Sequence, residues 1–210
     1  MTDITKELNI AEAELCRADP LIARIIQSQT PIRHSPRTNY FASLCQSIIS
    51  QQVSTLAAAA IFARLKQLTD LNPAQVVGLT PEQVKIIGLS RQKASYLMDL
   101  AGHFVANPRV YNHLSNSTDE EVITELTSVK GIGIWTAQMF LMFTLVRLDV
   151  FAPADLGLQK AIIQLYGLKK PITSEQMTTI SNKWRPYRTV ASWYLWGLLD
   201  SPFPEKKKAA

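Results

Sequence analysis

Apolar positions recur at intervals of three and four residues along most of the chain, which is the pattern of amphipathic helices. Residues 4–18 show it clearly, with Ile4, Leu8, Ala11 and Leu15 at helical spacing. Few stretches alternate apolar and polar positions as β-strands do. The sequence therefore predicts an all-α fold.

Start and stop signals set the expected helix boundaries. Asp19 is a candidate N-cap and Pro20 suits the first position of a helix, while Thr80-Pro81 and Thr118 provide similar starts. Gly167 is suited to end a helix. The expected helices cover about residues 4–18, 20–29, 40–50, 54–68, 81–87, 90–105, 118–126, 134–146, 156–166, 173–183 and 187–199.

Length and composition narrow the class of protein. A chain of 210 residues can bury one core or two small ones that share a cleft, and its net charge of +5 is compatible with a polyanionic partner. Cys16 and Cys45, with three scattered histidines, do not supply the ligands of a zinc or iron–sulfur site. The polar N-terminus lacks a signal peptide, and the longest apolar run is too short to span a membrane. We expect a reducing, intracellular location without membrane attachment.

The segment from Leu126 to Lys160 carries the candidate chemistry. Gly131 and Gly133 lie directly before an apolar run that begins at Ile134, which predicts a tight turn opening onto a buried helix. Free N–H groups at such a turn favour an anion, and Lys130 adds a positive charge. The turn is either a phosphate-binding hairpin or an ordinary connection between two helices.

Asp155 follows Pro153-Ala154 and precedes another expected helix. This position favours an N-cap, which is a structural role. A helix N-terminus also favours the ionised carboxylate that a catalyst would need, so the two roles are compatible.

Together, the hairpin ending in Gly131-Ile132-Gly133, the Thr136-Ala137 helix and Asp155 resemble the helix-hairpin-helix DNA glycosylases with a Gly/Pro-Asp motif. Within that superfamily, residues 21–200 look like the 3-methyladenine DNA glycosylases.

This resemblance implies an architecture of two helical bundles with an active-site cleft between them. Residues 39–145 would form the bundle with the helix-hairpin-helix motif, and residues 1–38 with 146–210 would form the second.

The resemblance also implies an activity. The protein would excise alkylated purines, such as 3-methyladenine and 7-methylguanine, from duplex DNA by flipping the base and hydrolysing the N-glycosidic bond in base excision repair. Asp155 would be catalytic, and Trp135, Met139 and Trp196 would line the base pocket. Trp135 stands where lyase-type relatives carry a catalytic lysine, which favours water as nucleophile. Met139 matches a position where the family often has an aromatic residue.

The same resemblance points to DNA contacts. Gln52, in the polar turn 50–53, matches the residue that enters the minor groove, although such a turn is equally typical of a solvated connection. Lys130, Gly131 and Gly133 would grip the DNA backbone, and Arg91 would offer a further charge to a phosphate. The expected partner is double-stranded DNA with alkylated bases, bound by a monomer.

In the family, hairpin carbonyls often hold a monovalent cation, and Thr127, Val129 and Ile132 match those positions. Na⁺ or K⁺ is therefore possible there, and we expect no other cofactor and no iron–sulfur cluster. By the same resemblance the protein would act in the cytoplasm or nucleoid of a bacterium, or in the nucleus of a eukaryote.

Two other classes stay open. A non-catalytic DNA-binding module can use the same hairpin. A bifunctional or mismatch glycosylase of the superfamily is the nearer alternative, but the chain has Trp135 at the position of the catalytic lysine and lacks the four-cysteine cluster that such enzymes carry.

Overall fold

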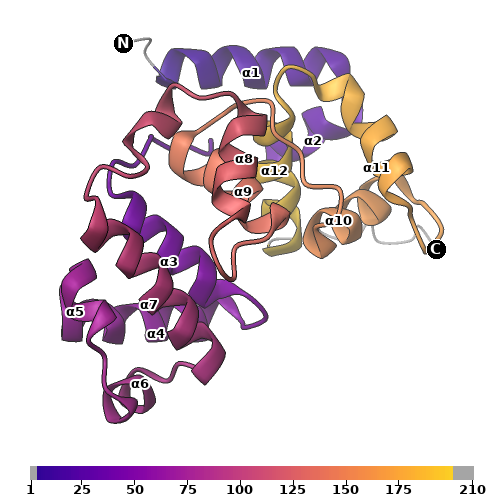
Figure 1. The fold of residues 1–210 in the computed structure, drawn as a ribbon. Helices are drawn as coiled ribbons and strands as arrows, with labels where there is room; N and C mark the ends of the chain where they lie inside the picture. Colours follow the sequence, from indigo (N-terminus) through magenta and orange to yellow (C-terminus); the bar gives the residue numbers. More distant parts are fainter. Residues whose placement is uncertain (1–3, 201–210) are drawn as a thin grey trace. The chain divides into compact units, whose positions relative to one another are not determined.

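The computed structural model describes residues 4–200, and over this range it contains helices and turns but no strand (Figure 1). The predicted all-α class is confirmed. No helix within the described range is long and apolar enough to cross a membrane. The α-helices are α1 (Ile4–Ala18), α2 (Pro20–Ser28), α3 (Tyr40–Ser50), α4 (Thr55–Thr69), α5 (Pro73–Val77), α6 (Pro81–Ile87), α7 (Arg91–Ala106), α8 (Asp119–Thr127), α9 (Ile134–Phe140), α10 (Leu156–Tyr166), α11 (Ser174–Ser181) and α12 (Arg188–Asp200).

The chain forms two compact units. The first combines the described parts of Met1–Ser35 and Val146–Ala210, and we call it the terminal unit. The second is Pro36–Leu145, which we call the hairpin unit.

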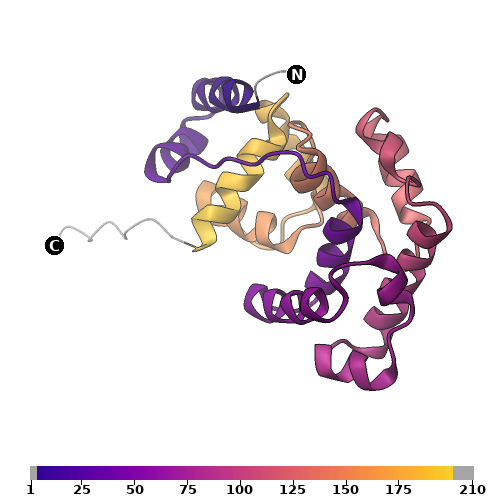
Figure 2. The ribbon, with the colours of Figure 1, turned by 90° about the vertical axis from the view of Figure 1, so that its left-hand side faces the viewer.

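The hairpin unit is built around α3. This helix packs against α4, α7 and α9, while α5 packs on α7, α6 on α4, and α8 on α9 (Figure 2). The buried apolar residues of α3 explain its central position, because they pack against all three of these helices. The buried apolar residues of α3 are Phe41, Leu44, Cys45, Ile48 and Ile49.

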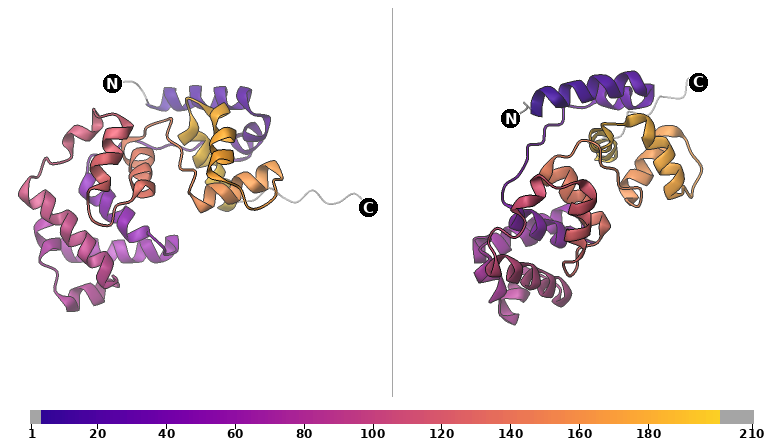
Figure 3. Two further views of the ribbon diagram at one scale, coloured as in Figure 1. Left: turned by 45° about the vertical axis from the view of Figure 1, so that its right-hand side comes forward. Right: turned by 45° about the horizontal axis from the view of Figure 1, so that its top comes forward.

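The terminal unit is built around α12, which packs against α1, α2 and α10 (Figure 3). Aromatic residues contribute to its core, where Trp184 and Tyr194 are fully buried. The Gln29 side-chain amide donates to the Tyr194 carbonyl at 3.0 Å, which ties the end of α2 to α12.

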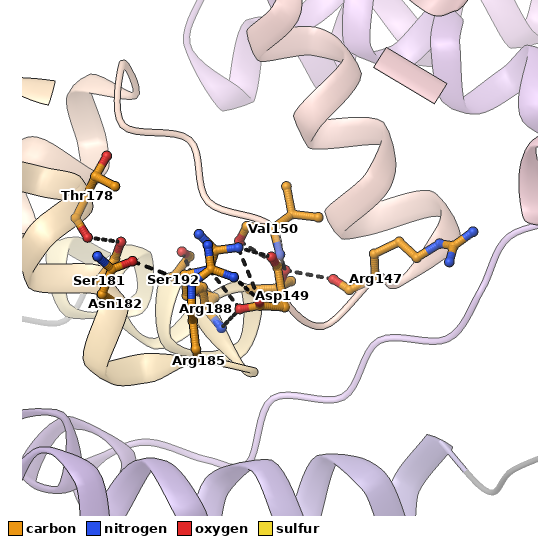
Figure 4. Close-up of polar contacts among 10 residues, drawn as sticks. Arg147, Asp149, Val150, Thr178, Ser181, Asn182, Arg185, Arg188 and Ser192 are labelled. Carbon is orange, nitrogen blue, oxygen red and sulfur yellow. Dashed lines mark hydrogen bonds and ion pairs between the residues drawn. The ribbon is translucent and has the colours of Figure 1, made fainter. Parts of the chain in front are cut away.

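A charged cluster fastens the start of α12 to the turn at residues 147–150 of the same unit (Figure 4). Asp149 accepts from the guanidinium groups of Arg188 at 2.7 Å and Arg185 at 2.9 Å. The Thr189 hydroxyl donates to the Arg147 carbonyl at 2.6 Å. These contacts place the segment that leads to Asp155.

The helix that begins at Ile134 is shorter than expected. The run predicted as one helix over 134–146 is α-helical only to Phe140; Leu141–Leu145 form a π-helical turn, and Val146 has a φ of +55°. The Thr144 carbonyl accepts from the backbone N–H of Arg37 at 2.9 Å, so a distant segment competes for a helical acceptor.

Two short helices were absent from the sequence prediction. They are α5 and the 3₁₀ turn Asn112–Ser115, which are too short to show a period. The helix predicted over 173–183 also ends early, at Ser181, and passes into the 3₁₀ turn Asn182–Trp184.

Candidate functional site

The hairpin between α8 and α9 requires glycine at its tip. Gly131 has a φ of +84°, a backbone conformation that side chains with a Cβ rarely adopt. A Cβ at this position would also lie 2.1 Å from the Tyr96 ring, so any side chain there would displace Tyr96. The sequence predicted the turn, but it gave no signal that Tyr96 of α7 presses against it.

The rest of the hairpin alternates buried and exposed positions. Val129 and Ile132 are buried, and the Ile132 N–H donates to the Val129 carbonyl at 3.1 Å, which closes the turn. Lys130 is exposed and donates to the Ser95 hydroxyl at 3.3 Å, while Gly133 is exposed as the N-cap of α9. The two apolar anchors fix the turn and leave Lys130 and Gly133 at the surface. The cation predicted at the carbonyls of Thr127, Val129 and Ile132 stays a prediction.

A second turn lies beside the hairpin. Gln52, between α3 and α4, is exposed and has a φ of +56°. For a residue with a Cβ this conformation costs about 1 to 2 kcal/mol, so the surrounding contacts must hold it. The Gln51 amide donates to the Gly131 carbonyl at 2.9 Å and to the Thr136 hydroxyl at 3.2 Å. Gln51 therefore joins this turn to the hairpin.

These two turns and the α6–α7 turn surround a hollow of about 450 Å³. Gln52 and Gly131 both line it, so the structure brings together two residues that the sequence singled out separately. Arg91, the exposed first residue of α7, lines a different, more apolar hollow together with Leu79 and Met98. Polar side chains, among them Gln52 and Lys93, therefore line the hollow beside the hairpin.

Trp135 and Met139 share one face of α9. They are four residues apart on the helix, which places their side chains one above the other, and both are half-buried. Neither is a fully buried core residue. The structure thus puts two predicted pocket residues side by side.

Asp155 caps α10 and is 8% exposed. Its Oδ1 accepts from the Leu158 N–H at 2.7 Å and from the Trp196 indole Nε1–H at 2.9 Å. The cap that the sequence suggested is therefore present, and Trp196 adds a contact that the sequence did not predict. Both donors fix the orientation of the carboxylate at the N-terminus of α10.

Gly157 makes room for this contact. A Cβ at Gly157 would lie 3.0 Å from both Asp155 Oδ1 and Trp196 Nε1. A side chain there would crowd both the acceptor and the donor of this hydrogen bond. Gly157 lies two residues after Asp155, but only the packing of α12 on α10 shows why it is glycine.

Comparisons with known proteins assign the family. The model of the HhH-GPD superfamily of base excision DNA repair proteins matches residues 45–186. The chain belongs to this superfamily. DNA-3-methyladenine glycosylase 1 of Schizosaccharomyces pombe is 30% identical, over 92% of this chain and 89% of the relative. DNA-3-methyladenine glycosylase of Saccharomyces cerevisiae is also 30% identical, over 96% of this chain and 74% of the relative.

A solved structure supports the same HhH-GPD assignment. The 3-methyladenine DNA glycosylase of S. pombe in complex with abasic DNA has a TM-score of 0.84 and is 28% identical, covering 93% of this chain and 99% of that one. The all-α fold and the family resemblance inferred from the sequence are thus confirmed.

Proposed function

We propose that this protein is a monofunctional DNA glycosylase that excises alkylated purines, such as 3-methyladenine and 7-methylguanine, from duplex DNA. Its HhH-GPD relatives at 30% identity are DNA-3-methyladenine glycosylases, which hydrolyse N-glycosidic bonds in base excision repair. Asp155 carries the chemical part of the proposal. Its carboxylate is held at a helix N-terminus by two hydrogen bonds, one of them from an aromatic side chain.

The substrate's own charge makes one carboxylate sufficient. A purine alkylated at N3 or N7 is cationic, so it leaves without a strong general acid. As the bond to the sugar breaks, positive charge develops on the sugar, and the Asp155 carboxylate stabilises it and orients the attacking water. The fixed hydrogen bonds from Leu158 and Trp196 mean that this anion needs no reorganisation during the reaction.

Aromatic rings account for selectivity in this proposal. The face of a tryptophan attracts a cation by about 0.5 to 2 kcal/mol, which favours an alkylated, cationic base over a neutral one. Trp135 and Trp196 are our candidates for this contact, and Met139 shares the face of α9 with Trp135. Because residue 135 is tryptophan and not lysine, we assign water as the nucleophile, with no strand cleavage.

The hairpin unit supplies the grip on DNA. Gln52 would enter the minor groove in place of the flipped nucleotide, and the exposed Lys130 and Gly133, with Gly131 between them, would face the backbone. Arg91 would add a phosphate contact, and a Na⁺ or K⁺ ion at the hairpin carbonyls would bridge to phosphate. Such a protein would work as a monomer on duplex DNA, in whichever compartment holds the genome.

Base release from methylated DNA tests this function. Purified protein should release 3-methyladenine or 7-methylguanine, detected by chromatography, and Asp155→Asn should abolish release while DNA binding is retained. The asparagine oxygen can accept the same two hydrogen bonds, so the variant removes charge and keeps the cap. Undiminished release by Asp155→Asn would reject the assigned role.

Covalent trapping separates this function from a lyase, and a salt titration tests the contacts to the DNA backbone. Borohydride reduction during turnover should trap no covalent protein–DNA adduct, whereas a lyase would form one. DNA affinity should fall steeply with salt, because backbone contacts release counterions. DNA binding without any base release from a panel of modified duplexes would instead indicate a non-catalytic module.

A further inference from the structure

The α3–α4 turn, residues 51–54, is fastened by two side chains to which neither the sequence nor the proposed function assigned a role. Gln51 bonds to the hairpin, as described above. Lys93 of α7 donates its ammonium to the carbonyls of Ile49 and Gln51, both at 2.6 Å. These carbonyls belong to the last turn of α3, where the backbone acceptors have no partner within the helix.

The chemistry of Lys93 suits this position. A positive charge at a helix C-terminus is stabilised by the helix dipole, and an ammonium offers three donors. Lys93 is half-buried, and burial lowers the pKa of its ammonium below the ordinary value. The desolvation of a charge is unfavourable unless its contacts offset the loss, so the two short bonds hold the end of α3 firmly.

The Lys93 hydrogen bonds lie directly before Gln52, whose backbone has a positive φ. Its left-handed backbone conformation lies between the Lys93 contact on one side and the Ser54 cap of α4 on the other, where Ser54 accepts from the Ala57 N–H at 3.3 Å. Unfavourable backbone conformations persist when surrounding contacts determine them, and they occur often at ligand-binding positions. Gln51, one residue earlier, links the same turn to Gly131.

We propose that Gln51 and Lys93 are positioning residues that hold Gln52 in its left-handed conformation and lock the α3–α4 turn to the DNA-binding hairpin. This inference rests on the proposed function for the roles of Gln52 and the hairpin. The two turns then meet DNA as one preformed surface, so little ordering is needed when the duplex binds. Neither Gln51 nor Lys93 needs to touch the reacting atoms.

Amide hydrogen exchange in the free protein tests the lock itself. Gln51→Leu and Lys93→Met preserve the size of the side chains and remove the donors. Each variant removes two hydrogen bonds. Each should raise exchange at the Gln51 N–H, which donates to the Ile48 carbonyl, and at the last turn of α3 by at least about fivefold, the effect of one lost hydrogen bond. Gln51→Leu should also raise exchange at the Ile132 N–H of the hairpin. Gln83→Leu is the matched control, because it removes an amide that caps α6 in the same unit and leaves this turn alone.

A duplex with a tetrahydrofuran abasic site next to 2-aminopurine tests the consequence. Insertion of Gln52 unstacks the fluorophore and raises its emission. Both variants should reduce this enhancement by about fivefold, whereas Gln51→Leu should bind an intact duplex as tightly as the wild type. Lys66→Met controls for the charge lost in Lys93→Met, because Lys66 is an exposed cation on α4. Thermal melting confirms that each variant is folded.

The outcomes are separable from the enzyme assay. Unchanged exchange at the Gln51 N–H and the last turn of α3 in both variants overturns the inference, whatever the protein does to methylated DNA. Equal losses of affinity for abasic and intact duplexes also overturn it, because they show a general structural role. Failure of the wild type to release any base counts against the proposed function alone.

Discussion

Asp19 and Asp155 are two buried aspartates in the terminal unit, and both cap a helix and accept a hydrogen bond from a tryptophan. Asp19 is 2% exposed and caps α2 with Oδ1. Its Oδ2 is surrounded by the Tyr166 hydroxyl, the Trp184 indole at 3.2 Å and the Lys183 ammonium at 3.2 Å. Asp155 is 8% exposed, and its Oδ1 accepts both from the backbone of α10 and from Trp196.

A capping position in the sequence does not reveal what else a carboxylate does. The Lys183 ammonium neutralises Asp19, which joins α2 to α10 and to the turn before α12. The charge of Asp19 therefore stabilises the fold. Asp155 accepts from the Leu158 N–H and the Trp196 indole, and it is the carboxylate to which the proposed function assigns the catalytic role. We therefore interpret Asp19 as structural and Asp155 as the group that acts on substrate, and matched substitutions can break this distinction.

The largest expected effect is on catalysis at Asp155. Asp155→Asn should lower the single-turnover rate of base release by about 100-fold or more, because it removes the charge that stabilises the cationic sugar. Asp19→Asn should leave the rate per folded molecule unchanged. Equal losses in the two variants would remove the distinction between the two aspartates.

The next largest effect should be the loss of stability in Asp19→Asn. Asp19→Asn should lower the free energy of unfolding by about 2 to 3 kcal/mol, because an amide nitrogen or a neutral oxygen would replace the charged acceptor of three donors. Asp155→Asn should change the free energy of unfolding by less than about 1 kcal/mol, since its cap is retained. Urea unfolding followed by circular dichroism measures both.

Substitution of Trp196 should affect catalysis, whereas substitution of Trp184 should affect stability. Trp196→Phe removes the indole donor to Asp155 and should slow base release by about tenfold, the effect of losing one hydrogen bond to a charged group. Trp184→Phe removes the donor to Asp19 from a fully buried position and should act on stability instead. A rate lost in Trp184→Phe and retained in Trp196→Phe would contradict our interpretation.

Acid should selectively remove the contribution of Asp19. Burial raises its pKa, but hydrogen bonds from Tyr166, Trp184, the Leu21 N–H and Lys183 together hold the pKa below the ordinary value of 3.8. The resulting stability is present above about pH 4 and is lost as the pH falls through the lower, folded-state pKa. The difference in unfolding free energy between wild type and Asp19→Asn should therefore shrink as titration proceeds below pH 4, and a constant difference would contradict this cause.

The smallest effect should come from the cation of the Asp19 cluster. Lys183 is 45% exposed and lies 4.7 Å from the centre of the Tyr166 ring. Lys183→Met should lower the free energy of unfolding by about 1 kcal/mol or less, because solvent screens an exposed partner. A larger loss would show that the charge pair, and not the hydrogen bonds of Tyr166 and Trp184, carries the cluster.

Most helices were predictable because their signals are local. The Asp19-Pro20, Thr80-Pro81 and Thr118 starts are confirmed as caps, and the structure adds a capping box between Thr118 and Glu121. The apolar run after Ile134 misled the prediction, because periodicity does not distinguish an α-helix from one that passes into a π-helical turn. The acceptor that Arg37 takes from this run is more than a hundred residues away along the chain.

The candidate site was predictable only where a backbone motif or a family resemblance marked it. Glycines at 131 and 133 predicted a turn, and the turn is present. Lys93 gave no signal, because a lysine near the start of a helix reads as a solvated charge until α3 is placed beside it. Tyr96, which fills the space at Gly131, was equally silent.

By itself, the sequence determined the all-α class, most helix boundaries, the hairpin and the capping role of Asp155, because propensity, periodicity and capping act over a few residues. It also carried the motif that places the chain in its family. Only the tertiary structure decided that Asp155 contacts Trp196 and that Asp19 contacts Lys183. It also decided that Lys93 is the lysine that holds the Gln52 turn. Those contacts join residues far apart in the chain, and packing alone brings them within hydrogen-bonding distance.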